Sequence, residues 1–203
     1  MTWIIIIIIF IVCLILYYGS YFYKPFKVDL SMLPEQFVVV DVETTGLDSE
    51  KHEIIEIGAV RVHRDSNMHD TFTALIKPKK KISNKIIEIT GITNEMLEQQ
   101  GEQLNNVLSD YLKFIGDSRL VYFNAPFDHA FLSRDIKNMG VQINNPISCA
   151  LDMARRAWPS LKSYKLSYLT KSLDTAGKHR ALKDCELTIS VYTAAAHKLR
   201  SVD

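Results

Sequence analysis

Several features that place a protein in a specialised class are missing from this chain of 203 residues. Its three cysteines, Cys13, Cys149 and Cys185, form neither a CxxC pair nor an even set. They favour free thiols in a reducing compartment, and none is typical of a metal ligand. Lysine plus arginine (24) nearly balance aspartate plus glutamate (23), so the formal net charge is only +1. Binding to nucleic acid or anionic lipid by bulk attraction is disfavoured, and any such binding must be local.

Charged residues are also absent between Trp3 and Tyr23, a stretch that is almost wholly apolar. A helical run of about 20 apolar residues matches the hydrocarbon core of a bilayer. A buried strand is disfavoured because strands rarely exceed about ten residues. A cleaved signal peptide is disfavoured because basic residues before the run and an A-x-A-like site after it are missing. We therefore expect a transmembrane helix at residues 1–23, with the lipid bilayer as a partner.

The flanking charges predict the orientation of this helix. No lysine or arginine precedes it, whereas Lys24 and Lys27 follow it, so its C-terminal side should be cytoplasmic. Two prolines in the next segment argue against a continued helix. Residues 24–35 are therefore expected to link the membrane helix to a domain at residues 36–203.

The domain begins with strand patterns. FVVVDVE has the unbroken apolar start of a central strand, and EIIEIGAVRVHRD and HDTFTALIKP follow as second and third strands. Their close succession predicts an antiparallel meander. The apolar face of the second strand changes near Gly58, where we expect a β-bulge.

Helical patterns dominate the rest of the chain. Apolar residues recur at helical spacing from Leu104 to Ile115 and stop at Gly116. RLVYFN is then a fourth strand, APFDHAFLSRDIKNMG a helix closed by Gly140, and ISCALD a short fifth strand. Further helices are expected around ALDMARRAW, KLSYLTKSL and ALKDCELTISVYTAAAHKL. The fold class is therefore α/β, a mixed sheet flanked by helices.

Acidic residues stand where these elements end or begin. Asp41 and Glu43 lie two apart on the first strand, so they share a face. Asp128 lies near a helix start, His179 in a loop and Asp184 in the first turns of the last helix. Each piece alone has a simple alternative, such as a helix N-cap for Asp128 or a solvated loop histidine. Together they favour a site for hard cations, because crowded carboxylates repel unless a cation compensates them.

Two such cations can hold a phosphodiester and activate a water molecule for in-line attack. A mobile histidine with a pKa near neutrality is suited to take the proton of that water.

The motifs DVETTGL, ITGIT, NAPFDHAFL, YKLSYL and HRALKDCELT resemble those of the DnaQ-like 3′–5′ exonucleases of the DEDDh type. This group contains the proofreading epsilon subunit of bacterial DNA polymerase III. The resemblance covers about residues 36–199 and implies a ribonuclease H-like fold with a five-stranded mixed sheet. It implies that Asp41, Glu43, Asp128 and Asp184 are catalytic ligands of two Mg²⁺ or Mn²⁺ ions, with His179 as the general base.

The resemblance also implies contacts to the 3′-terminal nucleotide. The turn after the first strand would meet the terminal sugar, where glycine permits close backbone approach. Ile89 would be a wedge against the terminal base, and residues after the fourth strand would form the floor. The expected substrate-binding residues are Thr44, Thr45, Gly46, Leu47, Ile89, Thr90, Asn124 and Phe127. Turn chemistry for Gly46 and core packing for Phe127 stay open as alternatives.

The sequence departs from the family pattern at two positions. Phe123 stands where histidine is common, and Lys183 stands before Asp184 where acidic or small residues are frequent. In addition, KPKKKISNK carries five lysines between Lys77 and Lys85, either as a solvated loop or as a phosphate-binding guide for a single strand. Arg155 and Arg156 leave the same two possibilities open.

The sequence thus predicts a metal-dependent 3′–5′ exonuclease that releases nucleoside monophosphates from single-stranded DNA. We expect it in a bacterial inner membrane, single-pass, with the catalytic domain in the cytoplasm. An exoribonuclease is the alternative, because no motif reads the 2′-hydroxyl. A non-catalytic, membrane-tethered nucleic-acid-binding module is a further alternative. No polymerase-docking tail is evident after the last helix, which favours stand-alone action.

Overall fold

The computed structural model of the protein describes residues 33–66, 68–173 and 178–200. The expected transmembrane helix at residues 1–23 and most of the expected linker lie outside these ranges. Within them, no helix is long and apolar enough to cross a membrane.

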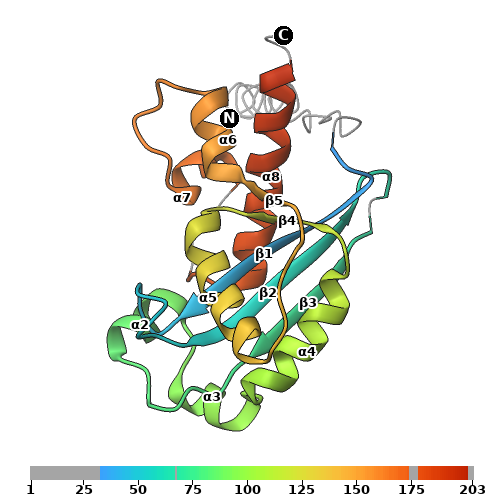
Figure 1. The fold of residues 1–203 in the computed structure, drawn as a ribbon. Helices are drawn as coiled ribbons and strands as arrows, with labels where there is room; N and C mark the ends of the chain where they lie inside the picture. Colours follow the sequence, from blue (N-terminus) through green and yellow to red (C-terminus); the bar gives the residue numbers. More distant parts are fainter. Residues whose placement is uncertain (1–32, 67, 174–177, 201–203) are drawn as a thin grey trace, which may run out of the picture.

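A five-stranded mixed sheet in the order β3-β2-β1-β4-β5 forms the centre of the fold (Figure 1). β1 (Gln36–Thr44), β2 (Ile54–His63) and β3 (Asp70–Leu75) form the expected antiparallel meander. β4 (Arg119–Tyr122) pairs in parallel with β1, and β5 (Ile147–Cys149) in parallel with β4. The structure confirms the expected α/β class, and the apolar run of β1 has the expected central position.

Helices cover both faces of this sheet (Figure 1). Their bounds are α2 (Asn84–Thr90), α3 (Asn94–Gln100), α4 (Leu104–Ile115), α5 (Ala125–Asn138), α6 (Ala150–Ala157), α7 (Leu166–Leu169), the 3₁₀ helix η2 (Lys171–Leu173) and α8 (Ala181–Arg200). Gly116 and Gly140 follow α4 and α5 with positive φ, as expected of residues that close a helix.

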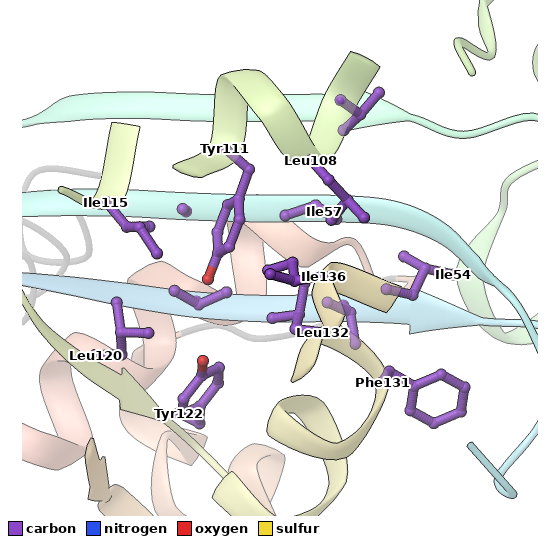
Figure 2. Close-up of a cluster of buried hydrophobic side chains, with 14 of the residues drawn as sticks. Ile54, Ile57, Leu108, Tyr111, Ile115, Leu120, Tyr122, Phe131, Leu132 and Ile136 are labelled. Atoms are coloured by element: carbon purple, nitrogen blue, oxygen red, sulfur yellow. The ribbon is translucent and has the colours of Figure 1, made fainter. Parts of the chain in front are cut away.

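Alternate residues of β1 face two different cores. Val38, Val40 and Val42 pack against α4 and α5, where Leu108, Tyr111, Leu132 and Ile136 meet the sheet (Figure 2). Phe37 and Val39 pack on the opposite face against α6 and α8. Because side chains alternate along a strand, Asp41 and Glu43 belong to the α8 side of the sheet. The apolar half of β1 therefore fixes the face on which its acids appear.

The expected bulge at Gly58 is wrong. β1 and β2 keep a regular register from His63 to Glu56, with Gly58 opposite Asp41. The irregularity lies between Glu43 and Thr44, where the pairing passes from Glu56 to Ile54. The apolar pattern changes along β2 because both faces of residues 54–60 are buried, and not because a residue is inserted.

Gly58 instead permits close contact between β2 and α8. A Cβ atom at this position would lie 2.5 Å from the Ala181 carbonyl carbon and 2.5 Å from the Leu182 backbone nitrogen. Such distances are too short for any side chain, so glycine lets the first turn of α8 rest directly on the strand. Asp184 lies in the same turn, three residues after Ala181.

No helix was predicted between Pro78 and Gln103, where the structure has α2 and α3. Both begin with a side-chain cap: Ser83 accepts from the Ile86 N–H and Thr93 from the Met96 N–H. These are ordinary N-cap signals, and they were available in the sequence. The expected helix at KLSYLTKSL is only the short pieces α7 and η2.

Candidate active site

The parallel pairing of β1 and β4 places the first acids together. The carboxyl ends of both strands lie at one edge of the sheet, so Asp41 and Glu43 on β1 meet the segment that follows β4. α5 begins there, and Asp128 in its first turn is 3% exposed. Its Oδ1 accepts a hydrogen bond of 3.2 Å from the Val42 N–H, between the two acids of β1. Three of the expected ligands are thus brought together.

α8 brings His179 and Asp184 to the same edge. The helix begins at Ala181, so His179 is in the preceding loop and Asp184 in the first turn, both as expected. His179 Nδ1 lies 2.7 Å from Asp184 Oδ2. Potential ligand atoms of Glu43, His179 and Asp184 all lie within 4.8 Å of one another. Asp184 is buried, whereas the His179 side chain is 55% exposed and accessible to a reactant.

The electrostatics of this edge disfavour charged acids. Burial, followed by repulsion from Asp128 and the other acids, raises the pKa of Asp41 well above its ordinary value. Burial and the nearby Asp184 raise the pKa of Glu43 to about 8. Burial chiefly raises the pKa of Asp128 to about 7, against the stabilising Val42 N–H. The hydrogen bond to Asp184 raises the pKa of His179.

The donor set fits a hard divalent cation. The carboxylates of Asp41, Glu43, Asp128 and Asp184 converge from three elements, and oxygen is the donor that Mg²⁺ and Mn²⁺ prefer. Burial chiefly, and then repulsion between neighbouring acids, raises the pKa values of Asp41, Glu43 and Asp128, so their charged forms are disfavoured without a cation. A bound cation would supply the missing positive charge, so these four residues could hold the metal.

An ion pair between a buried acid and a half-buried arginine, which the sequence motifs did not indicate, supports α8. Glu56, on β2 and 1% exposed, accepts hydrogen bonds from Arg180 Nε at 3.0 and 3.1 Å and from Arg180 Nη2 at 2.6 Å. It also accepts one from the Ala181 N–H at 2.9 Å, so it caps the helix. Because Arg180 follows His179 directly, this pair fixes the loop of the candidate base. An acid in the middle of an apolar strand was the available signal.

The turn after β1 holds the residues that were expected to contact the terminal sugar. The Thr44 hydroxyl donates to the Gly46 carbonyl at 2.7 Å. The Thr45 hydroxyl lies 3.1 Å from His52 Nδ1, and a Cβ atom on Gly46 would overlap the His52 ring. Any side chain at position 46 would therefore have to displace the ring of His52, a residue that belongs to none of the sequence motifs. Leu47 extends from this turn and is 85% exposed.

The ITGIT segment lies beside the histidine loop. The Ile89 carbonyl accepts a 3.0 Å hydrogen bond from the His179 N–H, and the Ile89 side chain is 42% exposed. Thr90 is 2% exposed; its hydroxyl donates to the Ile86 carbonyl at 2.9 Å and accepts from the Ile92 N–H at 3.1 Å. The side chain of Thr90 is thus used in ending α2, whereas Ile89 is available at the surface.

The segment after β4 places Asn124 and Phe127 next to Asp128. Asn124 is the exposed N-cap residue of α5, and its side chain makes no capping hydrogen bond. Phe127 is partly buried, and its ring centre lies 5.2 Å from that of Phe131, so core packing accounts for part of its surface. Phe123, where histidine is common in the family, also packs in a core.

The three other basic positions that the sequence singled out differ in their surroundings. Lys183 is exposed on the first turn of α8, and nothing in the described part of the structure explains it. Arg155 pairs with Asp152 at 3.3 Å, and Arg156 is exposed on the same helix. Neither arginine lies among the residues that the structure brings together at the carboxyl edge of β1.

Comparison with known proteins agrees with this geometry. The sequence matches the exonuclease family RNase_T over residues 38–192. Over 179 residues it is 36% identical to the DNA polymerase III subunit epsilon of Aquifex aeolicus, covering 87% of this chain and 88% of that protein. The chain belongs to the RNase_T exonuclease family. It is an exonuclease of the 3′–5′, hydrolytic type, as the sequence motifs predicted.

Other relatives contain the exonuclease as a small part of a larger protein. The chain is 40% identical over 162 residues to the PolC-type DNA polymerase III of Halalkalibacterium halodurans. These matched residues make up 78% of this chain. The match covers only 11% of that polymerase, so this exonuclease spans about a ninth of its PolC-type relative.

Solved exonuclease structures share the fold. Exonuclease X in complex with 5′ overhanging duplex DNA aligns with a TM-score of 0.62 and 27% identity, over 78% of this chain and 90% of that chain. The zinc-bound complex of Escherichia coli ExoI with single-stranded DNA aligns with a TM-score of 0.70. The ExoI identity is 20%, over 83% of this chain and 41% of that chain, so this likeness concerns the fold alone.

Proposed function

We propose that this exonuclease hydrolyses the last phosphodiester bond at the 3′ end of single-stranded DNA and releases nucleoside monophosphates, with two Mg²⁺ or Mn²⁺ ions as cofactors. The observation that carries the proposal is the convergence of Glu43, His179 and Asp184 within 4.8 Å, beside Asp41 and Asp128. The divalent ions would supply charge for the phosphate oxygens and lower the pKa of the attacking water.

The histidine contact defines the direction of proton transfer. With Nδ1–H donated to Asp184 Oδ2, the free Nε2 of His179 is the atom that takes a proton from water. The water oxygen then forms a bond to phosphorus, and the bond between phosphorus and the 3′ oxygen of the preceding nucleotide breaks. That 3′ oxygen gains a proton from solvent, so a nucleoside 5′-monophosphate leaves.

DNA is the substrate favoured by the relatives. The epsilon subunit and the PolC-type enzyme are named as DNA polymerase III proteins, and exonuclease X is described with bound DNA. The test uses matched DNA and RNA strands, each labelled at the 5′ end, with the purified full-length protein and Mn²⁺. Progressive shortening of the labelled DNA supports the proposal. Faster shortening of RNA would assign an exoribonuclease, and binding without cleavage would assign a non-catalytic module.

We further propose that residues 1–23 anchor the enzyme in a bacterial inner membrane, single-pass, with the catalytic domain in the cytoplasm. The support is the uncharged stretch between Trp3 and Tyr23, followed by Lys24 and Lys27. The full-length protein should sediment with membranes and resist extraction by high salt and alkaline carbonate. Recovery in the supernatant after a carbonate wash would contradict the anchor.

A further inference from the structure

The lysine loop at residues 77–81 is fixed to the candidate active site at its start. The Lys79 N–H donates to Glu53 Oε2 at 3.1 Å. Glu53 in turn is joined to the nucleotide turn: its carbonyl accepts from the Thr45 N–H at 2.9 Å and its N–H donates to the Thr45 hydroxyl at 3.1 Å. Glu53 therefore links the lysine loop by hydrogen bonds to Thr45, in the segment expected to bind the terminal sugar.

The other end of the loop leads to the histidine. After the loop, the Asn94 side chain accepts from the Ile82 N–H at 2.8 Å and donates to the Ile82 carbonyl at 3.2 Å. α2 follows and ends at Ile89 and Thr90, where the Ile89 carbonyl accepts from the His179 N–H. α2 lies at the end of the molecule toward which the β1 arrow points (Figure 1). The loop thus borders the site between the turn after β1 and the histidine.

The lysines of this loop differ in whether their ammonium groups form ion pairs. Lys77 pairs with Glu98 at 2.6 Å, and Lys79 Nζ lies 4.0 Å from Glu53 Oε1. Within the described ranges, no carboxylate oxygen lies within 4.0 Å of the Nζ atoms of Lys80 and Lys81, and both residues are exposed. They lie on the wall of a surface hollow of about 490 Å³ formed with α3. Two ammonium groups without a close ion pair therefore stand at the border of the site, with Lys81 within electrostatic reach of Glu95 in the same hollow.

We propose that Lys80 and Lys81 bind the phosphates of the strand upstream of the 3′-terminal nucleotide. The inference rests on the proposed function, because it needs a 3′ end seated at Thr45 and Ile89. A nucleic-acid backbone fits better than an anionic lipid surface, since both ends of the loop are bonded to segments of the active site. Lysine contacts of this kind are independent of sequence and weaken with salt.

The test compares two substrates that differ only in upstream phosphates. One is a single-stranded DNA of about 20 nucleotides; the other is thymidine 5′-monophosphate p-nitrophenyl ester, which has one nucleotide. For full-length K80A/K81A, kcat and KM on the ester should match the wild type, whereas KM on the long strand rises. The slope of log KM against log salt should flatten by about 0.7 for each phosphate that the variant no longer binds.

The control K113A/K137A removes the same charge near the C-terminal ends of α4 and α5, away from the loop, and should match the wild type on both substrates. Equal behaviour of K80A/K81A and the wild type on the long strand would overturn the inference. So would weaker binding of K80A/K81A to phosphatidylglycerol vesicles with an unchanged KM on DNA, which would assign the lysines to lipid.

The two proposals can fail separately. If the wild type cleaves neither substrate, the proposed function fails. Binding of the labelled strand to Asp41→Ala, with and without K80A/K81A, still tests the lysines by fluorescence anisotropy. A loss of affinity on removing the lysines supports their contact with DNA, and an unchanged affinity contradicts it.

Discussion

The buried acids near the active site differ in whether the chain itself supplies a partner for their charge. Glu56 is buried but makes four hydrogen bonds to Arg180 and the Ala181 N–H. Burial, and then the other acids around them, raises the pKa values of Asp41 and Glu43. Glu56 therefore has a structural partner in the chain itself, whereas the acids of β1 are suited to an external cation. One residue positions the site and the others are available for its chemistry.

Glu56→Gln should lower kcat about tenfold or more and leave KM nearly unchanged. The amide would present N–H donors to the Arg180 guanidinium, so the His179 loop would lose its fixed position. Because the Arg180 side chain is 42% exposed and water can solvate part of its charge, a loss of only about 1–2 kcal/mol in the free energy of unfolding is also expected. Steady-state kinetics and thermal melts check both values.

Asp135→Asn is the matched control for Glu56→Gln. Asp135 is 6% exposed and pairs with Arg134 at 2.7 Å, but it lies outside the histidine loop. This variant should lose stability and keep kcat. An equal loss of kcat in both variants would show that Glu56 acts only through general stability.

At the scale of elements, close packing of α8 on β2 places Asp184 and His179 opposite the acids of β1. Gly58→Ala should disturb this packing, because the added Cβ would lie 2.5 Å from the α8 backbone. We expect a loss of about 1–3 kcal/mol in the free energy of unfolding. We also expect a fall in kcat beyond that caused by a stability loss alone, because α8 must move.

Val60→Ala is the control for the helix displacement. Val60 is buried on the same strand and packs on the α8 side, but its truncation removes volume and inserts none. It should lower the melting temperature while kcat stays close to the wild-type value. If Gly58→Ala retained full kcat, contact between the helix and the strand would not set the geometry of the site.

Sequence patterns predicted the elements whose burial is simple. β1, α4 and the antiparallel meander of β1, β2 and β3 were predicted from apolar runs and helical spacing, and the candidate site residues were predicted from motifs at strand ends and from the family resemblance. The bulge expected at Gly58 was wrong because burial of both strand faces removes the alternation that marks register. Glu56 within an apolar strand signals that a partner is needed, but Arg180 lies 124 positions away, so local patterns do not identify that partner.

At the scale of the whole molecule, the crowded acids should make the stability of the folded protein depend on pH and on bound metal. In metal-free protein the pKa of Asp41 is raised well above 3.8, that of Glu43 from 4.5 to about 8 and that of Asp128 from 3.8 to about 7. Between the ordinary pKa values of these acids in the unfolded chain and their raised values in the folded protein, the folded state binds more protons than the unfolded state. The free energy of unfolding therefore falls as pH rises through this window. The melting temperature of chelated protein should therefore decrease from about pH 5 to about pH 9.

Mn²⁺ should reverse most of this decrease, and its effect should be larger at high pH, where the acids are charged. Each 1 kcal/mol of stability corresponds to about 2–4 °C in melting temperature for a chain of this size. Glu43→Gln should flatten the pH dependence of the chelated protein, since it removes one titrating group. A melting temperature that rises with pH in EDTA would contradict the raised pKa values.

The most direct test of the whole scheme is metal-dependent cleavage by the wild type and by Asp41→Asn. Asparagine keeps the size of the side chain but removes the charge that a divalent ion requires. A single strand labelled at the 5′ end should be shortened nucleotide by nucleotide by the wild type with Mg²⁺ or Mn²⁺, and left intact in EDTA. Asp41→Asn should remain folded and lose at least about a hundredfold in rate, consistent with the loss of several kcal/mol of charge stabilisation. Cleavage by the wild type in EDTA, or full activity of Asp41→Asn, would contradict a metal site built on these acids.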